Sequence, residues 1–438
     1  MQKPIKGIEL WNKGKKILPG GSQLLSKRSE LFAPNQWPSY YKKAKGVEVE
    51  DIDGNTYIDM YGMGIGSCIL GYADDEVNEA VKNAVDAGSM CLLNAPEEVE
   101  LAELFCQIHP WAGMVRYTRG GGEAMAVAVR IARAYSGKEK VAFCGYHGWH
   151  DWYIAANLAD DKNLDGHLLP GLDSRGIPRG LKGTSIPFQY NRIEELEKIV
   201  AEHEIGVIVV EPFRLQEPKD NFLEKIREIA DRIGAVLVFD EITIGWRVVV
   251  GGVHLRYGVN PDIAVFAKGT SNGFAMGVVI GKEEVMQAAQ FTFISSSYWT
   301  ERIGPVAALA TIRKMLRENI PQYLDRIGTL FAAAVREAAL KHGLEVQMEG
   351  LPGLLHFSFS YEEKSQAIRT LFTQEMLKRG ILASGGLYTS FAHKEEHIER
   401  YRKALDEVFP LLKTAIDGNR VQETLEGPVA HSGFKRLT

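Results

Sequence analysis

Two charged side chains stand where apolar runs end: Lys268 in "PDIAVFAKGTSNG" and Asp240 in "VLVFDEITIGWR". Each run has the length and composition of a buried strand, and open α/β sheets bind ligands at the carboxyl ends of such strands. Taken alone, a lysine at this boundary is more often a solvated loop residue, and an Asp-Glu pair can simply cap the next turn. Two strand ends of one sheet, however, can bring an amine and a carboxylate to a single ligand.

A carbonyl cofactor needs this combination of groups. A lysine amine forms a Schiff base with an aldehyde once burial has helped its ammonium to lose a proton. A carboxylate at a fixed distance keeps a pyridine nitrogen protonated, so that the ring can draw off the charge of a developing carbanion. The residues therefore point to pyridoxal phosphate, with Lys268 and Asp240 as the catalytic pair.

The stretch "YTRGGGEAMAVAVRIA" offers a cradle for the cofactor's phosphate. Gly120, Gly121 and Gly122 precede a helical pattern that Glu123 opens, and backbone N–H groups at a helix N-terminus bind phosphate without a cationic side chain. The alternative is a plain strand-to-helix turn. The spacing lacks the G-x-G-x-x-G pattern of a dinucleotide site, which weakens a nucleotide-dependent oxidoreductase as the α/β alternative.

The loop "CGYHGWHDWY" follows another expected strand and holds the aromatic residues that could stack on a pyridine ring. Tyr146 or His147 is the residue expected to face that ring, and the other aromatics are expected to pack around the site. His147 and His150 could also suggest a metal, but Gly148 breaks the helix between them and no cysteine or acid completes a ligand set. The sequence therefore predicts no metal site.

The elements that must position these residues alternate along the middle of the chain. The expected strands cover residues 115–119, 140–144, 205–212, 235–241, 261–268 and 277–282. The expected helices between them cover residues 123–137, 192–204 and 222–234. Apolar strands alternating with amphipathic helices predict an α/β fold whose mostly parallel sheet is covered on both faces.

The two ends of the chain have a different pattern of expected helices and strands. Residues 46–60 read as a hairpin, and the last hundred or so residues combine long helices with short strands, as in a smaller α+β domain. We expect an N-terminal segment at 1–50, a large domain at 51–305 and a small domain at 306–438. Residues 158–187 have no period, which favours a lid over the active site, although an ordinary surface loop is the alternative.

Composition excludes several classes of protein. The 438 residues carry a net charge of −5 and no lysine/arginine-rich tract, so a nucleic-acid partner is not expected. No apolar run approaches the roughly 18 residues of a membrane span, and no signal peptide is recognised. The four cysteines have neither C-x-x-C spacing nor histidine partners, which favours reduced thiols and a cytoplasmic location.

These pieces, in this order, resemble the class III pyridoxal-phosphate-dependent aminotransferases, and within them the glutamate-1-semialdehyde 2,1-aminomutase-like branch. The resemblance runs from "LPGG" at 18–21 to "SFAHKEEHIE" at 390–399. Its markers are "GVEVEDIDGNTYIDM", "GGEA", "YHG", "FDE", the lysine at the strand end and "ALATI". It implies the type I fold of these enzymes, with a small domain built from both chain ends.

The resemblance also implies roles for single residues. Lys268 would carry the internal aldimine, Asp240 would pair with the pyridine nitrogen, and Ile242 and Tyr146 would pack against the two ring faces. Gly121 and Gly122 would hold the phosphate, helped by Gly120.

Two further roles come from the same resemblance. In this family a threonine from the neighbouring subunit also binds the phosphate, and Thr300 in "SSSYWTERIGP" falls on that position. The active site would then be shared across a homodimer. Gln216 would lie near the cofactor's phenolic oxygen.

This chain departs from the family pattern near the phosphate and the substrate. The cradle has lost the usual hydroxyls, so the phosphate depends more on backbone groups, Thr300 and Arg119. Residues 63–67 replace a Gly-Ser-Trp-Gly-Pro stretch that lines the substrate site of true aminomutases, and residues 244–247 replace Thr-Gly-Phe-Arg.

We therefore expect an aminotransferase that moves an amino group from a donor such as glutamate to a keto or aldehyde acceptor. The intramolecular aminomutase that makes 5-aminolevulinate, and a racemase on the same scaffold, are the alternatives. A non-catalytic protein that keeps the fold is disfavoured because both Lys268 and Asp240 are present.

Overall fold

The computed structural model describes residues 4–167 and 170–434, which group into two compact units. One unit joins the two ends of the chain, up to Asp74 and from Gln322 onward, and the other is Asp75–Pro321. The sequence prediction had set the boundaries at residues 51 and 305. The difference has a physical source, because helix α10 (Ile303–Arg317) packs on helices α2 (Asp75–Asp86) and α3 (Pro96–Ile108) of the middle unit.

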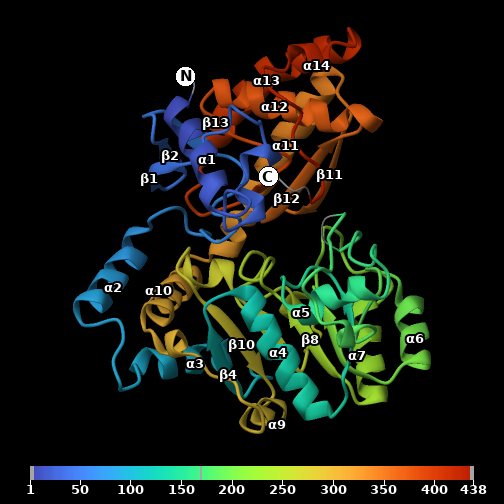
Figure 1. The fold of residues 1–438 in the computed structure, drawn as a ribbon. Helices are drawn as coiled ribbons and strands as arrows, with labels where there is room; N and C mark the ends of the chain where they lie inside the picture. The colour runs from blue at the N-terminus through green and yellow to red at the C-terminus, as the bar shows by residue number, and fades with distance from the viewer. Residues whose placement is uncertain (1–3, 168–169, 435–438) are drawn as a thin grey trace. The chain divides into compact units, whose positions relative to one another are not determined.

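A seven-stranded sheet forms the centre of the middle unit (Figure 1). Its strands, in spatial order, are β4 (Met114–Thr118), β10 (Gly277–Gly281), β9 (Ile263–Phe266), β8 (Val236–Asp240), β7 (Ile205–Val210), β5 (Lys140–Cys144) and β6 (Ser185–Pro187). The strands from β9 to β6 run parallel, and β10 is antiparallel to both of its neighbours. The mostly parallel sheet predicted from the sequence is confirmed.

Helices cover both faces of this sheet. Alternate side chains of β5, β7 and β8 pack under α4 (Gly121–Ser136) on one face. The intervening side chains pack under α6 (Ile193–Glu202) and α7 (Phe222–Ile233) on the other. The strands are apolar throughout because both of their faces are buried.

Short elements complete the middle unit. They are α5 (Asp151–Ile154), α8 (His254–Tyr257), α9 (Glu283–Met286) and the 3₁₀ helices η3 (Ala155–Leu158), η4 (Arg179–Leu181), η5 (Lys268–Ser271), η6 (Gln287–Gln290) and η7 (Ser297–Thr300). The aperiodic stretch at 158–187 holds η4 and β6, and its residues 168–169 lie outside the described residues. Asn157 fixes its start, because the Asn157 side chain bonds the N–H of Leu164 and the carbonyl of Leu172, both at 2.9 Å.

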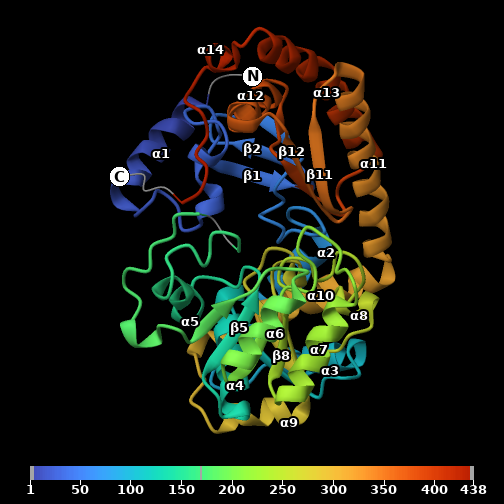
Figure 2. The same cartoon turned by 90° about the vertical axis from the view of Figure 1, so that its right-hand side faces the viewer.

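The terminal unit contains two smaller sheets (Figure 2). One comprises β1 (Tyr41–Lys45), β2 (Glu48–Asp51), β3 (Thr56–Asp59) and β13 (Ile381–Leu382), and the other β11 (Val346–Leu351), β12 (Leu354–Phe359) and β14 (Gly386–Tyr388). Its helices are α1 (Ile5–Ile17), α11 (Ile320–His342), α12 (Ser365–Lys378), α13 (Glu395–Asp417) and α14 (Val421–Thr424), with 3₁₀ helices η1 (Leu25–Lys27), η2 (Ser29–Leu31) and η8 (Glu362–Lys364). The hairpin β2–β3 belongs here because β13 pairs with β3.

The segment that replaces the aminomutase pattern forms a left-handed turn in the terminal unit. Four successive residues have positive φ, among them Met63 at 40° and the β-branched Ile65 at 57°. The Asp59 carboxylate accepts the N–H groups of Tyr61, Gly62 and Met63, which offsets the strain of this backbone. Within residues 4–167 and 170–434, no helix has the length and apolar character that crossing a membrane requires.

Candidate active site

The carboxyl ends of the parallel strands gather the predicted site residues at one edge of the seven-stranded sheet. Asp240 is the last residue of β8, and Lys268 follows β9 by two positions. Tyr146 and His147 follow β5, whereas Gln216 lies in the loop after β7. Because β5, β7, β8 and β9 are parallel, these loops emerge from the same edge of the sheet.

Asp240 is buried and forms its closest contact with His147. The Oδ2 atom lies 2.8 Å from His147 Nδ1, and Oδ1 accepts the N–H of Ile242 at 3.0 Å. The other ring nitrogen, Nε2, lies 3.2 Å from the carbonyl oxygen of Cys144. The two ring nitrogens of His147 thus face a carboxylate oxygen and a backbone carbonyl oxygen, which fixes the ring beside Asp240. His147 therefore contacts the carboxylate that was predicted to meet the pyridine nitrogen.

Lys268 is held in an uncommon conformation beside this carboxylate. Its φ of 45° lies in the left-handed region that favours glycine, and its Nζ donates a hydrogen bond to Thr243 Oγ1 at 2.7 Å. Burial lowers the pKa of the lysine from 10.5 to about 8, although the nearby charges of Asp240 and Glu211 oppose that shift. Roughly a tenth of the amine is therefore uncharged at pH 7, far more than at the ordinary lysine pKa, and the uncharged form is the nucleophile.

Glu211 links the loop of Tyr146 to the end of β7. Its Oε2 accepts the Tyr146 N–H at 3.0 Å and lies 2.6 Å from Arg214 Nη1. The Tyr146 ring meets Tyr153 edge-on, with ring centroids 6.1 Å apart. Tyr146 stays 38% exposed, so one side of this aromatic group is open to a ligand. Burial and the charges of Asp240 and Glu211 raise the pKa of its hydroxyl, which therefore keeps its proton.

The glycines before α4 form a cradle of backbone N–H groups. Glu123 Oε2 accepts the N–H of Arg119 at 2.9 Å and that of Gly120 at 3.3 Å. The N–H groups of Gly121 and Gly122 have no hydrogen-bond partner within the described parts of the chain. These two donors at a helix N-terminus are available to an anion.

The loop after β5 packs closely on this cradle. A Cβ on Gly148 would come within 2.9 Å of the Gly122 Cα, and a Cβ on Gly121 would come within 3.0 Å of Ile242 Cδ1. Gly148 also has a φ of 99°, which side chains rarely adopt. Glycine at these positions lets the loop, the cradle and Ile242 lie in contact.

Thr300 and Gln216 stand apart from the other predicted residues. Thr300 is exposed, and its Oγ1 donates to the carbonyl of Ser297 at 2.9 Å. Arg119, next to the cradle, donates to the carbonyls of Trp299 and Glu301 and so fixes this segment. Gln216 is also exposed, in a tight turn whose middle residue, Leu215, has a φ of 59°.

Several residues of this edge were not singled out from the sequence. Thr243 holds the lysine amine, and Glu211 and Arg214 hold the tyrosine loop. The position of Thr243 three residues after Asp240 was the only available signal for it. Glu211 ends an apolar strand, as Asp240 does, and that shared placement could have identified it.

The chain is similar to known proteins over nearly its whole length. Residues 32–405 match the family described as "Aminotransferase class-III". A 3-aminobutyryl-CoA aminotransferase of Cloacimonas acidaminovorans is 30% identical over 428 residues, which cover 94% of this chain and 99% of that protein. A glutamate-1-semialdehyde 2,1-aminomutase of Methanocaldococcus jannaschii is 31% identical over 430 residues, with coverages of 92% and 98%.

Solved structures share the fold. The internal aldimine form of the FumI protein of Sphingopyxis sp. MTA144 superposes with a TM-score of 0.84 at 23% identity, covering 94% of this chain and 98% of that one. A structure described as a transaminase with PLP bound has a TM-score of 0.83 at 26% identity, with coverages of 94% and 99%.

Proposed function

Because this chain belongs to the class III aminotransferase family, we propose that it moves an amino group from an amino acid such as glutamate to a keto or aldehyde acceptor. Its cofactor is pyridoxal phosphate, which a transaminase structure of similar fold contains. One observation carries the proposal: a lysine amine with a pKa of about 8 stands at the sheet edge beside a carboxylate that a histidine holds.

The residues of the middle unit fit this cofactor. The N–H groups of Gly121 and Gly122 suit a phosphate, and the Asp240 carboxylate suits a protonated ring nitrogen. The half-exposed Tyr146 and the side chain of Ile242 are the groups that would pack against the ring. Lys268 Nζ is the amine that would condense with the aldehyde carbon.

The proposed chemistry assigns each residue a task. The cofactor, when bound, takes up the electron pair that remains on the donor's carbon after its proton leaves. Lys268 Nζ removes that proton as a general base and later returns a proton as a general acid, for which a pKa near the working pH is favourable. Thr243 Oγ1 orients the amine through its 2.7 Å hydrogen bond. Asp240, held by His147, keeps a proton on the ring nitrogen.

A visible spectrum of the purified protein tests this proposal. We expect an absorption band of the lysine-bound cofactor that shifts when glutamate is added. Lys268→Ala should lose this band and slow amino transfer at least about 10²-fold, whereas Lys198→Ala, which changes an exposed lysine on α6, should leave both unchanged. A wild-type protein that stays colourless after incubation with pyridoxal phosphate would refute the proposal.

The aminomutase reaction is the second candidate, favoured by the 31% identity to the Methanocaldococcus enzyme. The two functions differ in whether an external acceptor is needed. Conversion of glutamate-1-semialdehyde to 5-aminolevulinate by the purified protein alone would establish the aminomutase. Release of 2-oxoglutarate from glutamate beyond one equivalent per active site, only when a second carbonyl compound is present, would establish the aminotransferase.

We also propose that the protein works as a homodimer in which Thr300 serves the phosphate site of the partner. The support is a set of strongly exposed apolar side chains on the middle unit, namely those of Leu92, Leu93, Phe291, Phe293 and Tyr298. The Arg302 N–H donates to the Ser89 carbonyl at 3.0 Å, which brings the two segments that carry these side chains toward each other. Exposed apolar surface of this kind marks interaction sites.

Light scattering of the purified protein tests the assembly. We expect twice the mass of the chain, and we expect Leu92→Glu with Phe291→Glu to yield monomers. Thr300→Ala should remain a dimer and bind pyridoxal phosphate more weakly, because one phosphate contact is lost. A wild-type monomer with full activity would contradict the shared site.

A further inference from the structure

A cavity of about 400 Å³ lies beside α4. Its polar lining comes from α4 and from the residues at the start of α5, namely Arg130, Arg133, His150, Asp151 and Trp152. The arginines stand nine and twelve residues beyond Gly121, which places them roughly 14 to 18 Å along the helix axis. The arginines are therefore distant from the proposed site of the cofactor's phosphate, whereas His150 lies close to Gly122 of that site.

Neither arginine of this cavity forms an ion pair in the part of the chain that the structure describes, although the charge of Glu139 acts on Arg133. Arg130 donates to the carbonyl of Phe293 at 3.1 Å, and Arg133 donates to the carbonyl of Glu139 at 2.8 Å. Within the described residues, no carboxylate lies within 4.0 Å of either guanidinium, although Asp151 lines the same cavity. Like charges three residues apart on a helix repel each other, so the pair lowers helix stability unless an anion offsets it.

Two buried nitrogen atoms in the lining also lack hydrogen-bond partners. They are His150 Nε2 and Trp152 Nε1, and Trp152 as a whole is only 7% exposed. A buried indole N–H without an acceptor costs free energy, so such groups usually face a bound molecule or an ordered water. The residues of the lining thus include two arginines together with a tryptophan and a histidine that each have a buried nitrogen without a partner.

We propose that this cavity binds a phosphoryl group, carried either by inorganic diphosphate or by an organic phosphate. A phosphoryl group offers three acceptor oxygens and up to two negative charges, which matches two guanidinium forks and further N–H donors better than the two oxygens of a carboxylate do. The volume is within the roughly 300–1,000 Å³ range of small-molecule sites and exceeds the needs of a single ion.

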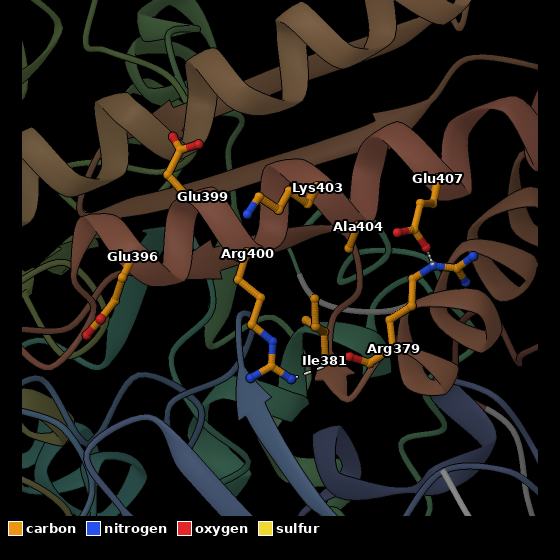
Figure 3. A pocket seen from close by; sticks show the side chains of 8 residues that line it. All are labelled: Arg379, Ile381, Glu396, Glu399, Arg400, Lys403, Ala404 and Glu407. Atoms are coloured by element: carbon orange, nitrogen blue, oxygen red, sulfur yellow. Dashed lines mark hydrogen bonds and ion pairs between the residues drawn. The ribbon is translucent and has the colours of Figure 1, made fainter.

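A second cavity, of about 660 Å³, lies in the terminal unit and differs in its charges (Figure 3). Its lining contains both basic and acidic side chains, so the charges offset each other. There the Arg379 guanidinium pairs with Glu407 at 2.8 Å, and Arg400 donates to the carbonyls of Arg379 and Gly380. None of its lining residues has a buried polar atom without a partner. That cavity gives no sign of a missing anion, in contrast to the cavity beside α4.

Calorimetric titration of the pyridoxal-phosphate-loaded enzyme with inorganic diphosphate, in low salt without phosphate buffer, tests the proposal. We expect saturable binding with a dissociation constant below about 1 mM and no change in the cofactor's visible band. Arg130→Gln with Arg133→Gln should weaken binding at least about tenfold. The charge-matched pair Arg192→Gln with Arg336→Gln, which changes exposed arginines elsewhere, should not weaken it.

A second titration, with adenosine 3′,5′-bisphosphate, separates the two sources of the phosphoryl group. Tighter binding than that of diphosphate assigns the cavity to an organic phosphate, and weaker binding assigns it to free diphosphate. Trp152→Phe keeps the ring and removes one donor, so it should weaken either ligand severalfold while the cofactor band and melting temperature stay unchanged. Equal binding by the wild type and the Arg130/Arg133 variant, or no saturation up to about 10 mM, would overturn the proposal.

Discussion

Asp240 and Glu241 follow one another at the end of β8, and each has a carboxylate oxygen 2.8 Å from the Nδ1 of a buried histidine. The pairs differ in the second nitrogen of each ring. His254 Nε2 accepts the indole N–H of Trp111 at 3.3 Å. His147 Nε2 instead lies 3.2 Å from the backbone carbonyl oxygen of Cys144.

The two carboxylates also differ in how completely their surroundings satisfy them. Glu241 accepts the N–H groups of Val253 and His254 as well as the His254 ring, and so it closes the loop before α8. Asp240 accepts one backbone N–H, from Ile242, and its charge acts on Lys268. Both residues form a carboxylate–histidine pair, but the pairs have different roles. The Glu241 pair stabilises the fold, whereas the Asp240 carboxylate places a negative charge in the candidate active site.

The largest effect should come from removing the Asp240 charge. Asp240→Asn keeps the size of the side chain but no longer holds a proton on a pyridine nitrogen, so we expect the amino-transfer rate to fall by roughly 10²- to 10³-fold. The melting temperature should also fall, because the buried His147 ring loses its charged acceptor, but the protein should remain folded. Stopped-flow measurement of the spectral change on adding glutamate gives the rate, and a decrease below about threefold would remove Asp240 from the proposed chemistry.

Glu241→Gln is the matched change in the neighbouring pair and should act on stability instead. The glutamine leaves buried N–H donors without a charged acceptor, which we expect to lower the free energy of unfolding by roughly 2 to 3 kcal/mol. The rate of the folded enzyme should remain within about twofold of the wild type. Urea denaturation measures the first quantity, and a large loss of rate with unchanged stability would erase the contrast between the two residues.

The sequence predicts the proximity of Asp240 and Lys268 better than it predicts the two carboxylate–histidine pairs. Asp240 and Lys268 both end apolar runs, and the alternation of strands and helices places such ends at one edge of a parallel sheet. That reasoning used only local patterns and one general rule of topology. It was enough to predict the sheet and to bring the two residues together.

The partners of the carboxylates depend on contacts that no local pattern encodes. Trp111 is 143 residues from His254, and His147 is 93 residues from Asp240. Buried polar pairs form wherever the fold brings two groups together, without any periodicity along the chain. The same limit applies to α10, whose amphipathic pattern shows that it packs on a core but not on which of the two units.

A smaller effect should appear in the pH dependence of cofactor capture. As pH rises through about 8, Lys268 loses its proton and becomes able to attack the aldehyde. The Asp240 charge raises this pKa, so in Asp240→Asn we expect the midpoint to fall by roughly 1 pH unit. Glu241→Gln should leave the midpoint where it is. The rate at which cofactor-free protein takes up pyridoxal phosphate, followed across pH 6–10, measures both.

An unshifted midpoint in Asp240→Asn, or an equal shift in both variants, would show that the two carboxylates act alike on the lysine. Lys268→Ala is the control for this measurement, since it should capture cofactor covalently at no pH.

The smallest effect is expected from a change next to the Glu241–His254 pair, and it tests whether this pair contributes only to stability. Trp111→Phe keeps an aromatic ring edge-on to His254 and removes only the indole N–H that His254 Nε2 accepts. We expect the free energy of unfolding to drop by about 1 kcal/mol, the value of one neutral hydrogen bond. Both the amino-transfer rate and the cofactor spectrum should match the wild type. If the spectrum changed instead, the His254 ring would influence the cofactor. The Glu241 pair would then act on the active site as well as on stability, and the contrast with Asp240 would be wrong.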